Sequence, residues 1–367
     1  MYKVSFIIPV QNEEKYISGC LESIFNSTYR NIEVIVVDNG STDNTKEMLL
    51  PYLDRITYIF RDSGGIASAR NLGFEKSNGK LLAFVDADDI TGKMRIELQV
   101  KKMLENEKLG MVFCGCTYIN DNGSFLHGVG RFPEFDKAKF IGMMFEKNRI
   151  LSISTTLIRR NVLEDVGVFD ESLPFLEDYD LWLRIGRKYP VDYIDLPITR
   201  IRKHSDNYRK KWKNTKELEK QILLKHDLRE IASSLAMVYD NEEDFRVSFG
   251  KILLKTGNRI EAVKNFVKAL KLNPDNFEAH FLIGNYYFEN KEIDRAVVSY
   301  KRCLRINPQH AECRNNLGVL LYYKGDIANS RMEFEKAKSI KSNFVDAEFN
   351  LSCIRKNSGI HKLRLHI

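Results

Sequence analysis

The sequence lacks the features that mark several large protein classes. Its six cysteines form no Cys-x-x-Cys pair, and the one close pair, Cys114 and Cys116, has no second pair to complete a zinc site. We therefore expect buried, reduced thiols of a cytosolic protein. No apolar run approaches the roughly 18 residues of a membrane span, and the N-terminal run is too short for a signal peptide.

Phosphate-binding glycine motifs are missing as well. No Gly-x-Gly-x-x-Gly follows a predicted strand, and no P-loop ends in Lys-Ser or Lys-Thr. This argues against plain dinucleotide binding and against a nucleotidyltransferase, which needs a basic glycine-rich loop after its first strand. The net charge of +7 is only mildly basic, and the interleaved aromatic residues of a nucleic-acid binder are absent.

The N-terminal part alternates strand and helix patterns. The chain has 367 residues, 43% of them hydrophobic, which is enough for two or three domains. The patterns predict strands at 3–10, 31–38, 55–60 and 80–86, with helices within 12–27, 41–50 and 64–77. Short connections of this kind indicate a parallel sheet covered on both faces, and such sheets bind ligands beyond the carboxyl ends of their strands.

The C-terminal third repeats with a period of 34 residues. Small and aromatic residues recur at this interval: Gly250, Gly284 and Gly318, and Phe266, Tyr300 and Phe334. The pattern resembles tetratricopeptide (TPR) repeats, which are paired helices stacked into an all-α solenoid. It predicts repeats at about 243–276, 277–310 and 311–344 and a capping half-repeat at 345–367. Such solenoids present a concave face, so we expect a protein partner there.

Acidic residues gather where the predicted strands end. Asp86, Asp88 and Asp89 follow the fourth strand, Glu13 follows the first, and Asp38 ends the second. An acidic rim repels phosphates unless a divalent cation lies between them, and Mg²⁺ takes one or two carboxylates together with phosphate oxygens. We assign Asp86 and Asp88 to such a site and Asp89 to the cap of a helix starting near residue 91 or 92. Capping by Asp88 stays open as the alternative.

Four stretches resemble the motifs of family 2 glycosyltransferases with the GT-A fold. They are "FIIPVQNEEKYISGCLESI", "IEVIVVDNGSTDNT", "GGIASARNLGFEKSNGKLLAFVDADD" and "FLEDYDLWLRI", and the resemblance covers about residues 1–210. It implies an α/β nucleotide-diphospho-sugar transferase with a Rossmann-like, mostly parallel sheet. It also implies inverting chemistry with Mg²⁺ or Mn²⁺ and, by family frequency, a UDP-sugar donor, while GDP and dTDP stay open.

The resemblance also implies roles for individual residues. Pro9, Val10 and Glu13 would form the first nucleotide loop, Asp38 would read the base edge, Arg70 and Asn71 would line the nucleotide, Asp86 would face the ribose or donor, and Asp88 would bind the metal. His204 would be an additional metal ligand, although a lone histidine is as readily polar surface. Arg202-x-His204-x-x-Asn207 resembles the family's closing loop over the donor diphosphate.

Inverting transfer also needs a carboxylate that accepts the proton of the acceptor hydroxyl. Glu177, Asp178 and Asp180 begin an apolar-periodic helix, where carboxylates also serve as ordinary caps. The resemblance points to Asp178 as the base and to Glu177 as an adjacent orienting residue. A basic run follows at 200–216, with eight Lys and Arg against one Asp. It suits a diphosphate, an anionic acceptor or acidic lipid, and equally a solvated linker.

We therefore expect a GT-A domain at 1–212, a helical linker at 213–242 and TPR repeats at 243–367. The expected function is transfer of a sugar from a nucleotide-diphospho-sugar to a hydroxyl of a glycan, lipid-linked or protein acceptor. The alternative is a catalytically silent, nucleotide-sugar-binding scaffold that acts through its repeats. We expect a cytoplasmic location, with peripheral contact at the inner membrane face left open.

Overall fold

The computed structural model describes residues 2–132, 135–204 and 215–355. The chain divides into two compact units, Met1–Met237 and Val238–Ile367. The division falls between the predicted boundaries at 212 and 242, because the two helices that follow residue 214 belong to the first unit.

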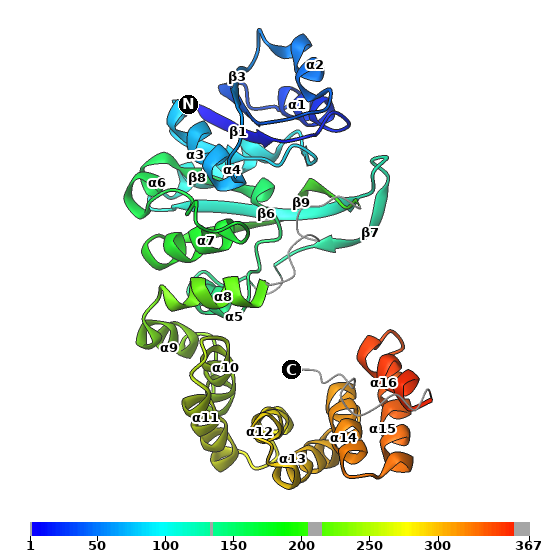
Figure 1. Ribbon diagram of the computed structural model, residues 1–367. Helices are drawn as coiled ribbons and strands as arrows, with labels where there is room; N and C mark the ends of the chain where they lie inside the picture. Colours follow the sequence, from blue (N-terminus) through cyan, green and yellow to red (C-terminus); the bar gives the residue numbers. More distant parts are fainter. Residues whose placement is uncertain (1, 133–134, 205–214, 356–367) are drawn as a thin grey trace. The chain divides into compact units, whose positions relative to one another are not determined.

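A mixed sheet runs through the first unit (Figure 1). Four parallel strands lie in the order β3 (Thr57–Arg61), β2 (Ile32–Asn39), β1 (Val4–Val10) and β4 (Leu81–Phe84). The sheet continues through β8 (Thr156–Arg159), β6 (Met111–Ile119), β9 (Val191–Arg202) and β5 (Ile90–Thr91), with β7 (Phe125–Gly130) beside β6. Strand β8 is antiparallel to β4 and β6, whereas β9 is parallel to β6. The predicted α/β class and all four predicted strands are confirmed.

Helices cover both faces of the parallel strands. On one face, α1 (Ile17–Phe25) and α4 (Arg95–Glu105) share a core with Phe6 and Ile8 of β1. On the other face, α3 (Ile66–Lys76) packs Ala69 against Ile35 and Val37 of β2. This two-sided burial explains why the strand sequences read as continuous apolar runs. The short helix α2 (Thr45–Leu49) and a 3₁₀ turn, η1 (Leu50–Tyr52), lead into β3.

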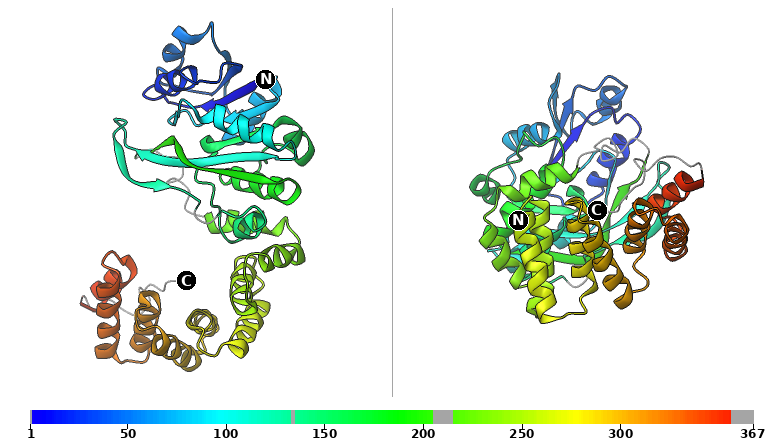
Figure 2. Two further views of the ribbon diagram at one scale, coloured as in Figure 1. Left: turned by 180° about the vertical axis from the view of Figure 1, so that it is seen from behind. Right: turned by 60° about the horizontal axis from the view of Figure 1, so that its bottom comes forward.

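Two of the remaining helices of the first unit pack on α5 (Phe140–Glu146). Both α7 (Glu177–Lys188) and α9 (Leu228–Ala236) pack on α5. Helix α8 (Thr215–Leu224) precedes α9, and α6 (Arg160–Val166) contacts α7. A 3₁₀ turn, η2 (Ile153–Thr155), leads into β8 and lies beside β4 and β6. The left view of Figure 2 shows the same elements from behind.

The second unit is a run of paired helices, as the repeat pattern predicted. The pairs are α10 (Glu242–Lys255) with α11 (Arg259–Leu272), α12 (Phe277–Glu289) with α13 (Ile293–Ile306), and α14 (Ala311–Tyr323) with α15 (Ile327–Ile340), followed by α16 (Val345–Arg355). The repeated glycine of each first helix faces the aromatic ring of its partner helix. All six cysteines of the chain carry free, buried thiols. Within the described ranges, no helix is both long and apolar enough to span a bilayer.

Candidate functional site

The candidate site lies at the carboxyl ends of the parallel strands, the edge at which the sequence analysis expects a ligand. Strand β4 ends at Phe84, and Asp86 and Asp88 follow in the next turn. Glu13 lies in the turn after β1. The backbone N–H of Glu13 donates to Thr45 Oγ1 at 2.8 Å. That bond ties the turn after β1 to the start of α2. Because β1 and β4 are neighbouring parallel strands, the carboxylates that follow them reach one rim of the sheet.

Arg70 of α3 joins this rim to α7. Its guanidinium donates through Nη2 to Asp86 Oδ1 at 2.8 Å and through Nη1 to Glu177 Oε1. The Arg70 side chain is only 3% exposed, and Glu177 is 7% exposed. A buried cation that bridges two carboxylates neutralises part of their repulsion. Arg70 therefore holds Glu177, the first residue of α7, against the turn after β4.

Asp178 is the second residue of α7 and is partly buried. Burial and the neighbouring charge of Glu177 raise its pKa to about 7, against the lowering influence of Arg70. Leu176, which precedes the helix, has a left-handed backbone with φ of 65°. Such strain in a non-glycine residue is tolerated at functional sites. A carboxylate that titrates near neutral pH is suited to accept a proton during catalysis.

His204 and Asp88 form a second pair at the rim. His204 Nε2 lies 3.0 Å from Asp88 Oδ2, and the imidazole packs against the ring of Tyr16. The hydrogen bond with Asp88 raises the pKa of His204. Glu13 lies close by, and its pKa is raised to about 8 by burial and by the charge of Asp88. The structure thus brings together Glu13, Asp88 and His204, which come from three separate segments.

The sequence predicts a divalent ion at this pair. Among the described residues, no group of three or more His, Cys, Asp or Glu is gathered as a metal cage. Mg²⁺ commonly takes only one or two protein ligands and completes its shell with phosphate oxygens and water. Neighbouring octahedral ligands lie about 3 Å apart when each is 2.0–2.1 Å from the ion. The 3.0 Å between Asp88 Oδ2 and His204 Nε2 is compatible with this spacing, and metal binding by the two residues stays a prediction.

Arg202, at the end of β9, ties the rim together. Its backbone N–H donates to Asp89 Oδ1 at 3.0 Å, and its Nε donates to the backbone oxygen of Asp88 at 2.9 Å. Asp89 also accepts from the hydroxyl of Ser152. The next helix begins only at Arg95, so the predicted capping role of Asp89 is wrong. Asp89 instead anchors the strand that delivers His204 to the rim.

Several predicted nucleotide-binding residues are committed to internal contacts. Asp38 is buried, accepting from Ser41 N–H at 2.9 Å and from the hydroxyl of Tyr58 at 3.0 Å. The carboxamide of Asn71 exchanges hydrogen bonds with the backbone of Phe169. These contacts hold loops in place beside the rim. Pro9 and Val10 are buried in β1, opposite Val37 and Asp38. Nucleotide contact by all four stays a prediction, and Asn207 lies outside the described residues.

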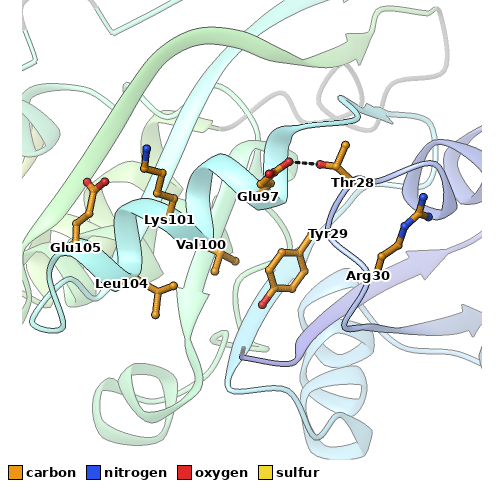
Figure 3. Close-up of a pocket in the computed structure, with 8 residues that line it drawn as sticks. All are labelled: Thr28, Tyr29, Arg30, Glu97, Val100, Lys101, Leu104 and Glu105. Atoms are coloured by element: carbon orange, nitrogen blue, oxygen red, sulfur yellow. Dashed lines mark hydrogen bonds between the residues drawn. The ribbon is translucent and has the colours of Figure 1, made fainter.

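A hollow of about 480 Å³ lies elsewhere on the first unit (Figure 3). Its walls come from α4 and from residues 28–30, which precede β2. Glu97 accepts a hydrogen bond from the hydroxyl of Thr28 at 2.5 Å beside it. The residues that line this hollow include none of the carboxylates of the rim.

Comparison with protein families agrees with both halves of the chain. A family model described as glycosyl transferase family 2 matches residues 5–167. Models of the TPR repeat match residues 250–291 and 284–325, and a tetratricopeptide repeat model matches residues 311–344.

Curated relatives carry matching names. An uncharacterized glycosyltransferase of Rickettsia prowazekii is 30% identical over 274 residues, which is 70% of this chain and 86% of that protein. The Escherichia coli protein WfgD, named UDP-Glc:alpha-D-GlcNAc-diphosphoundecaprenol beta-1,3-glucosyltransferase, is 32% identical over 198 residues, 53% of this chain and 74% of its own.

A solved structure shares the fold. S. aureus TarS 1-349, crystallised in complex with UDP-GlcNAc, superposes with a TM-score of 0.53 at 18% identity and covers 94% of this chain and 93% of its own. At this identity the likeness concerns the fold alone.

Proposed function

Because the chain belongs to glycosyltransferase family 2, we propose that it transfers a sugar from a UDP-sugar to an acceptor hydroxyl with inversion of the anomeric centre. The observation that carries this proposal is Asp178, a partly buried carboxylate with a pKa of about 7 at the start of α7. It stands next to Glu177, which Arg70 connects to the rim where Asp86 and Asp88 lie.

The choice of donor and acceptor rests on the relatives. TarS was crystallised with UDP-GlcNAc, and the name of the E. coli relative specifies UDP-glucose and an acceptor on diphosphoundecaprenol. We therefore propose a UDP-sugar donor and a glycan or lipid-linked acceptor for this chain. The repeats of the second unit would bind a protein partner or present the acceptor, since solenoids of this type offer extended binding surfaces.

In the proposed reaction Asp178 accepts the proton of the acceptor hydroxyl as the oxygen forms its bond to the anomeric carbon. The pair of electrons in the bond to the leaving diphosphate goes to that diphosphate, and the proton stays on the Asp178 carboxylate. Glu177 is held away from this proton by its bond to Arg70, so it orients the helix end and does not compete as the base. Only the ionised form of Asp178 can act, so activity should rise with pH through about 7.

We further propose that Asp88 and His204 hold Mg²⁺ or Mn²⁺ against the donor diphosphate. A bound divalent ion would supply charge compensation to the departing diphosphate. Without it, phosphates would meet the negative charges of Asp86 and Asp88 and be repelled. Replacing Asp88 by Ala should abolish metal-dependent binding of UDP-sugar, measured by calorimetric titration with and without Mn²⁺. Asp54→Ala, at an exposed carboxylate outside the rim, is the control. Metal-dependent affinity that survives in Asp88→Ala would refute the assignment.

The decisive experiment measures UDP release from a panel of UDP-sugars with Mn²⁺, using water or an added glycan as acceptor. Asp178→Asn should lower turnover by about 10²–10⁴-fold, the usual contribution of a general base. Asp165→Asn, at a carboxylate paired with Lys188 on the outside of α6, should leave turnover unchanged. Binding of UDP-sugar without any turnover by the unaltered protein would favour the silent scaffold instead.

A further inference from the structure

Helices α8 and α9 lie outside every family match but belong to the first unit. The glycosyltransferase model ends at residue 167, and the repeat models start at residue 250. The two helices nevertheless bury four aliphatic side chains almost completely, namely Ile222, Leu223, Ile231 and Leu235. Helix α9 packs on α5, on which the helix that carries Asp178 also packs. The segment is thus part of the body that surrounds the candidate base.

The turn between α8 and α9 carries Lys225, which reaches two carboxylates. Its Nζ donates to Asp180 Oδ1 at 2.8 Å and to Asp170 Oδ2 at 2.6 Å. Burial disfavours the charged lysine, but hydrogen bonds with both carboxylates outweigh this and raise its pKa. Asp180 is only 1% exposed, and its other oxygen accepts from Arg184 at 2.9 Å. A carboxylate buried this deeply needs such partners, since an uncompensated buried charge is strongly destabilising.

Asp180 stands in the first turn of α7, two residues after Asp178. Residues two apart on a helix point to nearly opposite sides, so Lys225 acts from the side away from the base. Arg70 holds Glu177, the first residue of the same turn. The end of α7 is therefore fixed by two cations from different parts of the chain. Arg187, later in α7, adds a further tie to α9 through Glu230.

We propose that Lys225 is a positioning residue for sugar transfer, which fixes the first turn of α7 through Asp180 and thereby sets the place of Asp178. The catalytic body then extends through α9, well beyond the family match. This inference rests on the proposed function, because it concerns the geometry of the proposed base.

The test uses the full chain and the UDP-sugar that the donor panel identifies. Lys225→Met keeps the length of the side chain and removes its charge. We expect kcat for UDP release to fall by 10- to 100-fold while the KM for the UDP-sugar changes by less than twofold, because the donor rim is untouched. Lys225→Arg should restore most of the kcat, since a guanidinium can also reach Asp180. Lys220→Met, in α8 and paired with Glu217, should behave like the unaltered protein.

A purely structural role would lower the amount of folded protein and leave kcat per folded molecule unchanged. Thermal unfolding and donor titration therefore accompany each assay. If Lys225→Met does not fold, Asp170→Asn is used in its place. Asp170 is partly exposed, and Asp170→Asn weakens its hydrogen bond with Lys225. Here a several-fold fall in kcat at constant KM supports the proposal.

Unchanged kcat in the folded Lys225→Met variant overturns the role of Lys225 while leaving the proposed function intact. Where Asp170→Asn is used in place of Lys225→Met, an unchanged kcat likewise overturns the role of Lys225. An unaltered protein that turns over no UDP-sugar overturns both.

Discussion

The two units of the chain bury polar groups in opposite ways. In the repeat unit they pair with one another, as when the hydroxyl of Tyr300 donates to Asn285 at 2.7 Å and Asn350 donates to Asn315 at 2.9 Å. At the rim of the first unit, carboxylates accumulate instead, and burial raises the pKa of Glu13 and of Asp178. Clusters of buried carboxylates with raised pKa values are typical of functional sites. This difference in how polar groups are buried distinguishes the repeat unit, as a scaffold, from the candidate site in the first unit.

Glycine is used differently in the two units as well. In the repeats, Gly250, Gly284 and Gly318 each face a ring so closely that an added Cβ would lie 2.3 to 2.7 Å from it. In the first unit each glycine allows a different close contact. A Cβ on Gly92, for example, would lie 2.1 Å from the backbone oxygen of Ile198. The same glycine–ring contact occurs in three repeats and so produces a period in the sequence. The close contacts of glycines in the first unit differ from one another and produce no period.

The largest expected effect tests where the first unit ends. Truncation after residue 237 keeps α8 and α9 and should leave donor binding intact, whereas truncation after residue 212 should unfold the protein. Each of the four buried aliphatic side chains of this segment contributes roughly 1.5–3 kcal/mol. Their sum is comparable with the total stability of a typical domain, about 5–15 kcal/mol. Circular dichroism and titration with UDP-sugar measure both outcomes. A folded, donor-binding 1–212 fragment would contradict this boundary.

The second test compares ion pairs in the two units. Arg70→Met leaves Asp86 and Glu177 without their shared cation, and losing one partner of a buried pair costs about 3–5 kcal/mol. Arg295→Met in the repeats removes an exposed pair with Glu292 and should cost less than about 1 kcal/mol. Urea denaturation gives both values. Equal costs would show that the rim does not bury its charges in solution.

The third test addresses the repeat unit alone. In Gly284→Ala the new methyl group would lie 2.4 Å from the ring of Tyr300, and overpacking of this kind costs about 1–3 kcal/mol. The repeat unit should therefore melt earlier while donor binding by the first unit is unchanged. Gly65→Ala, with open space and a φ of −78°, should shift neither transition. Separate transitions in calorimetry distinguish the units, and a loss of donor binding in Gly284→Ala would contradict their independence.

Local periodicity explains what the sequence could predict. The alternation of strand and helix predicted β1 to β4, and the 34-residue spacing predicted the repeats, because both follow from contacts repeated at short range. The rim followed from one topological rule, that parallel strands place their carboxyl ends together, which pointed to Asp86 and Asp88.

Long-range contacts explain what it could not. Arg70 meets Glu177 across 107 residues, and Lys225 meets Asp180 across 45 residues. Such pairs depend on the completed packing of α3, α7 and α8 and leave no spacing to recognise. The same holds for Asp89, which looked like a helix cap but bonds Arg202 across 113 residues.

The last test concerns how the stability of the folded protein depends on the protonation of the candidate base. The pKa of Asp178 is higher in the folded protein, about 7, than its ordinary value of 3.8. The folded state therefore binds the proton more tightly, and its stability falls as the pH rises from about 4 towards 7. Asp178→Asn avoids this loss, so its melting temperature should exceed that of the unaltered protein at pH 8 and equal it below pH 4.

Asp192 of β9 provides the control with the opposite sign. It is buried, which would raise its pKa, but ion pairs with Lys137 and Lys102 outweigh burial and lower it. An acid with a lowered pKa adds stability above its ordinary pKa and loses it as the pH falls. Asp192→Asn should therefore melt earlier at pH 8 and match the unaltered protein in acid. If both variants changed in the same direction at pH 8, Asp178 would be an ordinary structural carboxylate, and the contrast between a strained rim and a balanced framework would not hold.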